Sequence, residues 1–297
     1  MPYSATIFAF ITISLWSFLA YFAAQLNHVP PFLLVGIALC TSGVIGAVKL
    51  RSWRVPLKTL AVGIGGIFGY HFLYFTAFRY APAVEANLIN YLWPLLIVLL
   101  SPLYLPGYAL RLHHLIGATI GLIGAGLIVT GGHLSLDLTN LKGYLLALGA
   151  ALAWSSYSLL TKRLPPFPTA AVGAFCLFSG LLSLLVYLIE SLNNQSNFSL
   201  SSQDWILLLL LGAGPMGTAF FTWDAALKRG DPRIIGSLAY ITPLTSTLVL
   251  VFMGGRRLTW VSGIAMLLII AGAVIGSLDL FSREGKHVIK ESKEDIN

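Results

Sequence analysis

Long apolar stretches, separated by short polar connections, alternate along almost the whole chain. A transmembrane helix needs roughly 20 apolar residues, and these stretches lack the polar face of a buried helix in a soluble protein. The pattern therefore predicts an all-α membrane protein with ten transmembrane helices. Their approximate bounds are 4–23, 32–49, 59–79, 83–102, 112–131, 143–161, 170–190, 204–227, 233–253 and 258–278.

The composition agrees with this class. Of 297 residues, 57% are hydrophobic and 10% are charged, against roughly 45–50% and about 25% in soluble domains. The connections are too short for a soluble catalytic domain. The first stretch has no basic region before it, so we interpret it as a span rather than a signal peptide. Cys40 and Cys176 lie within spans, where they are expected to pack as small residues rather than form a disulfide or a metal site.

The net charge of +7 is distributed unevenly between the two sides of the predicted bundle. With the N-terminus in the cytoplasm, fourteen Lys and Arg residues lie on the inner side and four on the outer side. The outer four are Arg79, Lys142, Arg256 and Arg257. The positive-inside rule then places both termini in the cytoplasm. The charge is a topology signal and does not indicate a nucleic-acid partner.

One pattern occurs in both halves of the chain. The segment 87–94, Asn-Leu-Ile-Asn-Tyr-Leu-Trp-Pro, recurs in form at 236–243 as Gly-Ser-Leu-Ala-Tyr-Ile-Thr-Pro, with each Tyr three residues before a Pro. Trp16-Ser17 is likewise echoed by Trp154-Ser155. Two related halves with helix breakers at matching depths are typical of transporters.

The repeat predicts the domain organisation. We expect a five-helix repeat at 1–133, a second at 140–280 and a polar cytoplasmic tail at 281–297. Because five is odd, the second repeat crosses the membrane with opposite polarity. Substrate sites in such inverted repeats lie near the midplane, between the repeats.

Glycines are expected to serve two purposes. Gly117 and Gly121, like Gly272 and Gly276, form small-residue stripes that let helices approach closely. The glycines around Gly69 lead directly into a polar aromatic cluster, and there both a flexible backbone and a cavity lining remain open.

The candidate site begins at the two prolines. Pro94 and Pro243 each remove a backbone donor, which frees the carbonyls of Asn90 and Ala239. Free carbonyls at membrane depth need protein or a wet cavity to satisfy them. Helical spacing puts polar or aromatic side chains on the same faces. The candidate substrate-binding residues are His71, Tyr74, Asn90, Tyr91, Trp93, Trp154, Ser158, Tyr240 and Pro243, and the candidate hinges are Pro94, Pro243 and Gly69. Aromatic rings with a few hydrogen-bonding groups suit a planar, partly apolar solute.

Two acidic residues in or near the spans have two open interpretations. Intramembrane carboxylates often carry protons, so Glu85 and Asp224 are candidates for proton coupling. Alternatively, Asp224 pairs with Lys228 four residues on, and Glu85 holds Arg79 as a gate at the outer mouth.

The sequence contains no motif of an enzyme or an ATP-driven pump. The phosphate-binding loop and the G-x-S-x-G elbow are both absent. His113 and His114 are adjacent, so we expect them to project from different faces, unlike a zinc-binding i,i+4 pair. No catalytic residue, cofactor or metal is expected.

The residues quoted above resemble the drug/metabolite transporter superfamily of EamA type over about residues 4–280. The run from Glu85 to Pro94 is similar to the fourth helix of bacterial aromatic amino acid exporters of the YddG type, and Trp16-Ser17, Trp154 and Ser237–Pro243 also match. The resemblance implies a central cavity lined by His71, Tyr74, Tyr91, Trp93, Trp154, Tyr240 and Pro243.

We therefore expect a multi-pass inner-membrane carrier, monomeric in its working unit, that exports aromatic amino acids and related metabolites by alternating access. Its partners would be the small solute and the lipid bilayer. The alternatives are a carrier of drugs, purines or sugar conjugates with the same fold, and a membrane receptor or scaffold.

Overall fold

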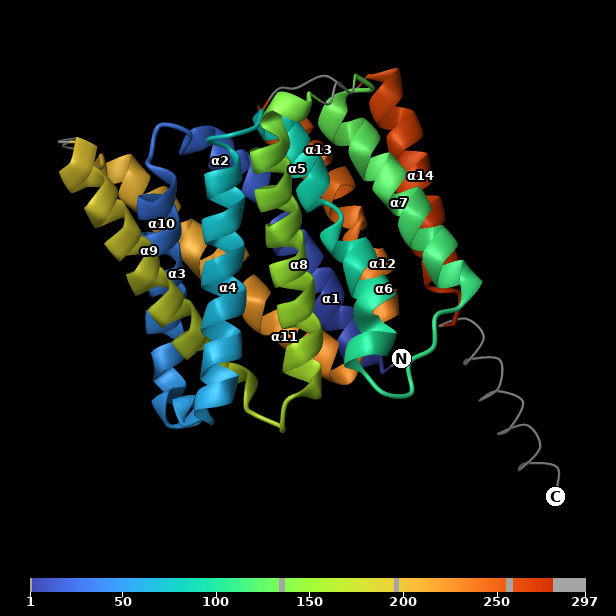
Figure 1. Ribbon diagram of the computed structural model, residues 1–297, viewed down its shortest axis with the longest axis horizontal. Coiled ribbons are helices and arrows are strands. Elements are labelled where there is room, and N and C mark those ends of the chain that lie inside the picture. Colours follow the sequence, from blue (N-terminus) through green and yellow to red (C-terminus); the bar gives the residue numbers. More distant parts are fainter. Residues whose placement is uncertain (1, 134–136, 195–197, 255–258, 280–297) are drawn as a thin grey trace.

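The computed structural model describes residues 2–133, 137–194, 198–254 and 259–279, which form helices and connections without a strand. The helices lie side by side as one bundle (Figure 1). They are α1 (Tyr3–Trp16), α2 (Leu19–Gln25), α3 (Pro31–Gly46), α4 (Leu57–Ala77), α5 (Ala83–Asn90), α6 (Trp93–Tyr104), α7 (Leu112–Thr130), α8 (Leu141–Arg163), α9 (Val172–Asn194), α10 (Ser202–Ala213), α11 (Ala219–Arg229), α12 (Pro232–Ala239), α13 (Ile241–Gly254) and α14 (Trp260–Gly276).

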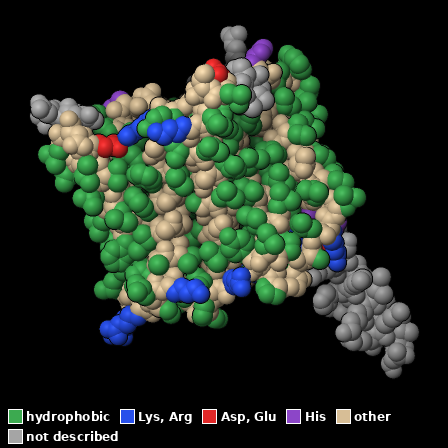
Figure 2. Space-filling model, in the orientation of Figure 1, with side chains coloured by type: hydrophobic (Ala, Val, Ile, Leu, Met, Phe, Trp, Pro, Cys, Tyr) green, Lys and Arg blue, Asp and Glu red, His purple; other side chains and the backbone are tan. Residues whose placement is uncertain are grey.

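Nine helical segments of the described residues are long and apolar enough to cross a bilayer. They are Tyr3–Gln25, Pro31–Trp53, Leu57–Ala77, Ala83–Tyr104, Leu112–Thr130, Leu138–Arg163, Thr169–Asn193, Ser202–Arg229 and Pro232–Met253. A shorter apolar helix, α14, lies where the tenth span is predicted. Hydrophobic side chains cover the middle of the face shown in Figure 2, and most of its Lys and Arg side chains lie toward its edges. The prediction of an all-helical membrane protein is confirmed.

Two spans are divided into two helices at the predicted depth. The span containing α5 and α6 breaks at Tyr91 and Leu92, and the span containing α12 and α13 breaks at Tyr240. Pro94 and Pro243 both lie in the first turn after the break, where a missing N–H has no helical partner to lose. In contrast, α4 continues through Gly69, so no helix break occurs there.

A third irregularity was not predicted. Between α10 and α11, residues Gly214–Thr218 form a π-helix turn that contains Pro215. The Pro215 carbonyl accepts a hydrogen bond of 3.1 Å from the indole N–H of Trp16 on α1. The wider turn therefore leaves a carbonyl that a neighbouring helix satisfies.

Glycines set the closest helix contacts. A Cβ atom on Gly272 of α14 would lie 2.6 Å from the backbone nitrogen of Gly121 and 2.7 Å from the carbonyl oxygen of Gly117, both on α7. These two helices run side by side (Figure 1). The interpretation of these stripes as packing surfaces is confirmed. Cys40 and Cys176 are free thiols, as expected.

Several predictions lie outside the described residues. These are the cytoplasmic tail 281–297 and the outer arginines Arg256 and Arg257.

Candidate functional site

Four tryptophans from four different spans meet in the interior of the bundle. The ring of Trp16 lies 5.9 Å from those of Trp93 and Trp154 and 5.1 Å from that of Trp223. Trp93 and Trp223 are 5.6 Å apart in an edge-to-face arrangement. All four side chains are buried. Aromatic pairs at these separations attract each other by more than the burial of their area contributes. The tryptophan cluster is therefore a well-packed part of the interior beside which a site can form.

Tyrosines and asparagines extend this cluster along α4 and α5. The ring of Tyr70 lies 5.3 Å from Trp154 and stacks on Tyr74 at 5.7 Å. The Tyr74 hydroxyl donates to the Asn87 side-chain oxygen at 2.8 Å, and the Asn90 amide donates to the Tyr70 hydroxyl at 3.3 Å. The tyrosines and Asn87 are only half-buried, whereas the tryptophans are buried. Polar groups therefore gather on one side of the tryptophan cluster.

Several polar atoms of these clusters have no partner among the described residues. The indole N–H groups of Trp16 and Trp223 are bonded, but those of Trp93 and Trp154 are not. The same is true of the Tyr91 hydroxyl, and the buried side-chain oxygen of Asn90 has no partner either. Of these polar atoms, only the Asn90 oxygen is fully buried, and leaving it unpaired costs about 1–3 kcal/mol. A solute with both donors and acceptors would satisfy them.

His71 has a defined tautomer in this arrangement. Its Nδ1 lies 2.7 Å from the Ile67 carbonyl oxygen, which can only accept a hydrogen bond. Nδ1 therefore carries the proton, and Nε2 of the neutral ring is an acceptor. The ring lies 4.9 Å from Tyr70 and 6.2 Å from Phe220, so this acceptor belongs to the same region.

Two predicted substrate-binding residues instead make internal contacts. The Ser158 hydroxyl is buried and accepts a hydrogen bond of 3.0 Å from the Trp223 indole. The buried Tyr240 hydroxyl accepts from the Leu95 N–H at 3.2 Å and donates to the Tyr91 carbonyl at 3.1 Å. The Tyr240 hydroxyl thus satisfies two backbone groups at the break between α5 and α6. The carbonyl it satisfies is one residue beyond the Asn90 carbonyl that the sequence singled out.

Sequence reasoning missed three members of the clusters: Tyr70, Phe220 and Trp223. Tyr70 is next to His71 in a helix whose polar face was read from His71 and Tyr74 alone. Trp223 and Phe220 follow the unpredicted π-helix turn, which changes the direction of every later side chain in that span.

The charged candidates lie in two places: Arg79 and Glu85 toward one end of the bundle, and Asp224 toward the other. The predicted contact between Glu85 and Arg79 is wrong, because Arg79 pairs with Glu190 at 2.6 Å and Glu85 accepts a short hydrogen bond from the Tyr144 hydroxyl. Glu85 is in the first turn of α5, and its carboxylate reaches α8 rather than the preceding loop.

The predicted pair of Asp224 and Lys228 is confirmed at 2.7 Å. Asp224 also accepts from the Thr169 hydroxyl at 2.7 Å, and Lys228 donates to the Phe167 carbonyl at 3.0 Å. These contacts tie α11 to the connection before α9.

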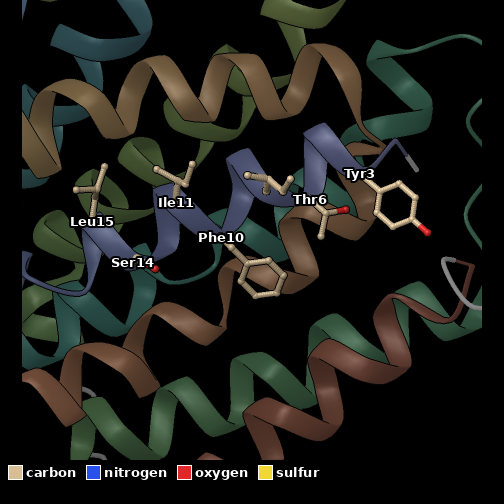
Figure 3. Close-up of a pocket in the computed structure, with 7 residues that line it drawn as sticks. Tyr3, Thr6, Phe10, Ile11, Ser14 and Leu15 are labelled. Atoms are coloured by element: carbon tan, nitrogen blue, oxygen red, sulfur yellow. The ribbon is translucent and has the colours of Figure 1, made fainter.

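Two further features lie outside the aromatic clusters. A mostly apolar groove of about 490 Å³ follows α1 between Tyr3 and Leu15, and Figure 3 shows its lining side chains along that helix. None of the predicted site residues lines it. At the end of α7, His113 and His114 converge on Asp279, within 4.8 Å of one another. The expectation that the two histidines point apart is wrong, since both rings reach one carboxylate.

Known proteins match the chain over nearly its full length. The model of the EamA-like transporter family matches residues 3–130 and again 141–278. An aromatic amino acid exporter YddG from Ancylobacter novellus is 41% identical over 284 residues, covering 93% of this chain and 97% of that protein. A probable amino-acid metabolite efflux pump of Salmonella typhimurium is 25% identical over 84% of this chain and 86% of its own length.

A solved crystal structure superposes with a TM-score of 0.87 at 39% identity, covering 94% of this chain and 98% of the other. Together with the membrane-spanning helices, these matches identify a multi-pass inner-membrane protein that transports metabolites. The chain belongs to the EamA-like transporter family.

Proposed function

We propose that this protein exports aromatic amino acids and related small metabolites by alternating access. The observation that carries the proposal is the tryptophan cluster with unpaired N–H groups on Trp93 and Trp154, next to half-buried tyrosines at a helix break. An indole or phenyl ring packs favourably among such rings. The amino and carboxylate groups of the solute would face the polar side of the site, and the 41% identical exporter supports the same substrate class.

The fold that supports this function is ten spans in two inverted repeats, 1–133 and 140–280, with both termini cytoplasmic. Three pairs of corresponding spans pack on each other: α3 on α9, α7 on α14 and α6 on α12. The contact of α4 with α8 is matched by that of α11 with α1. The double match of the family model, at 3–130 and 141–278, follows the same division. One chain is the working unit.

The site residues divide into two roles. His71, Tyr74, Asn90, Tyr91, Trp93 and Trp154 contact the solute directly, together with Tyr70. Ser158, Tyr240 and Pro243 hold these groups in place. Pro94 and Pro243 act as hinges between the half-helices, while Gly69, where an added Cβ atom would meet nothing within 4 Å, leaves room beside the site.

The charged residues gate the two ends. Arg79 and Glu190 join α4 to α9 at the outer end, while Asp224, Lys228 and Thr169 close the inner end. Asp224 is also the better candidate for proton coupling, because its carboxylate is buried and one of its oxygens has no partner among the described residues. Glu85 is assigned to the Tyr144 contact at the outer end.

The test is transport by purified protein in liposomes, with labelled Trp, Phe and Tyr and with and without a pH gradient. We expect saturable transport of all three, with weaker transport of Leu. Transport of purines, sugar conjugates or biotin without aromatic amino acids would refute the proposal; a biotin transporter of Escherichia coli is 25% identical to this chain. Asp224→Asn should remove any dependence on the pH gradient.

Two tryptophan variants compare the proposed site with an exposed position. Trp93→Phe keeps a ring in the cluster but removes the unpaired N–H, so transport of aromatic amino acids should fall several-fold. Trp205→Phe changes the same residue type at an exposed position on α10 and should have no effect. Equal transport by the two variants would remove Trp93 from the site.

A further inference from the structure

The first turn of α7 and the end of α14 bring three metal-ligating side chains together. His113 Nε2 lies 3.4 Å from Asp279 Oδ1, and His114 Nε2 lies 3.4 Å from Asp279 Oδ2. The donor atoms of all three side chains lie within 4.8 Å of one another. This cluster is outside the proposed transport site and takes no part in it.

The Nε2 atoms of both histidines are buried and have no hydrogen-bond partner among the described residues. His114 is fully buried, and neither of its ring nitrogens has a hydrogen-bond partner among the described residues. His113 Nε2 is also buried and has no such partner. Leaving buried nitrogens unpaired costs about 1–3 kcal/mol per group. A bound cation would use the lone pairs on the two Nε2 atoms.

The spacing of the donor atoms fits a specific class of ion. Ligands bound to Zn²⁺ at about 2.0–2.1 Å in tetrahedral geometry are about 3.3–3.4 Å from one another. Each Nε2 lies 3.4 Å from one of the two Asp279 oxygens, close to this value, and all the donor atoms lie within 4.8 Å of one another. Neutral imidazoles with one carboxylate suit Zn²⁺ and similar transition metals, whereas Mg²⁺ and Ca²⁺ prefer sites made only of oxygen.

A polar pocket adjoins the cluster at Asp279, while His113 and His114 lie outside its lining. It has a volume of about 250 Å³, and its lining includes Asp279, Gly107 and Tyr108. Water from this pocket would complete the coordination. We propose that His113, His114 and Asp279 form a Zn²⁺ site that ties α7 to α14 at their cytoplasmic ends.

The neighbouring charges make this a site of moderate affinity. Arg111 Nη1 donates to Asp279 Oδ1 at 2.8 Å and competes with the ion, but its side chain is 62% exposed and is free to swing away. The pocket that Asp279 lines is also lined by Lys162, Arg229 and Arg233. Arg233 is paired with Asp231 at 2.6 Å. Removing Arg111 should therefore strengthen binding, while removing a ligand should weaken it.

The experiment measures Zn²⁺ binding to the full chain in detergent, with any histidine tag removed. We expect one saturable site per chain, a rise in melting temperature with Zn²⁺ but not with Mg²⁺, and tetrahedral Co²⁺ absorption bands. His113→Gln and Asp279→Asn should each weaken binding at least tenfold, since even the loss of an outer-sphere partner costs 10–100-fold.

Two further variants keep the result interpretable. His133→Gln changes an exposed histidine outside the cluster and should bind Zn²⁺ normally. Arg111→Ala should bind Zn²⁺ more tightly, an outcome that a merely misfolded variant does not produce. The proposal fails if the native chain shows no saturable site, if the two ligand variants bind as the native chain does, or if Arg111→Ala weakens binding.

Discussion

Tyr240 and Tyr91 each stand three residues before a proline in the recurring sequence pattern, yet only the Tyr240 hydroxyl is hydrogen-bonded among the described residues. The Tyr240 hydroxyl bridges Leu95 N–H and the Tyr91 carbonyl at 3.2 and 3.1 Å. The Tyr91 hydroxyl has no partner among the described residues. Removing each hydroxyl with a Phe substitution therefore tests the assignment of one residue to the scaffold and the other to the solute.

The expected loss of stability in Tyr240→Phe follows from the two hydrogen bonds of the hydroxyl. Tyr240→Phe keeps the ring that packs on Gly121, with the virtual Cβ of that glycine 2.7 Å from the ring. It leaves one backbone donor and one acceptor unpaired in a buried region. Interhelical hydrogen bonds in membranes average about 0.6 kcal/mol and reach about 1.7, and an unpaired buried group costs about 1–3. We expect a loss of about 1–3 kcal/mol.

The assay is reversible unfolding of the purified protein in mixed micelles, followed by helical circular dichroism, together with transport in liposomes. Tyr91→Phe should change the free energy of unfolding by less than about 0.5 kcal/mol, as for a group without a partner, but it should reduce transport. Equal stability of the two variants would contradict the bridging role of Tyr240. Normal transport by Tyr91→Phe would contradict the solute contact of Tyr91.

Three further predictions concern packing and charge. Gly272→Ala should destabilise the protein by about 1–3 kcal/mol, because its Cβ would meet the α7 backbone at 2.6 Å, whereas Gly263→Ala, with open space around it, should be neutral in the same unfolding assay. A double-mutant cycle on Arg79 and Glu190 should give a coupling below about 1 kcal/mol, since both side chains are partly exposed; a larger coupling would reveal a desolvated pair. Burial opposes ionisation of Asp231, but hydrogen bonds and charge from the neighbouring guanidinium outweigh it and lower the pKa of this carboxyl below its ordinary 3.8. Its stabilisation is complete above the unfolded-state pKa and is lost as pH falls through the lower folded-state pKa, so Asp231→Asn should flatten the acid side of the stability curve, and an unchanged curve would refute this.

Hydrophobic length and helix breakers sufficed to predict nine spans of the described residues and both broken helices. These features are local, because a proline acts on carbonyls of its own helix and a span needs only a run of apolar residues. The packing role of the stripe at Gly117 was also predictable, because small residues four apart in a transmembrane helix mainly allow another helix to approach closely.

Contacts between spans were much less predictable. Helical spacing put Ser158 and Tyr240 on polar faces, but it does not show which helix approaches that face, and both hydroxyls turned out to bond inside the protein. For the same reason Glu85 was assigned the nearest arginine in sequence, whereas its partner Tyr144 belongs to another span.

The π-helix turn at Gly214–Thr218 has a consequence for how this span tolerates insertions and deletions. Such a turn holds one residue more than an α-helical turn, and one residue corresponds to about 100° of rotation around the axis. Deleting one residue there would remove the residue that the wider turn absorbs, so it would restore a regular helix while Trp223 still faces Trp16 and the Ser158 hydroxyl. In homologous proteins, a one-residue gap at this point would therefore mark a regular helix whose later side chains still line the same interior.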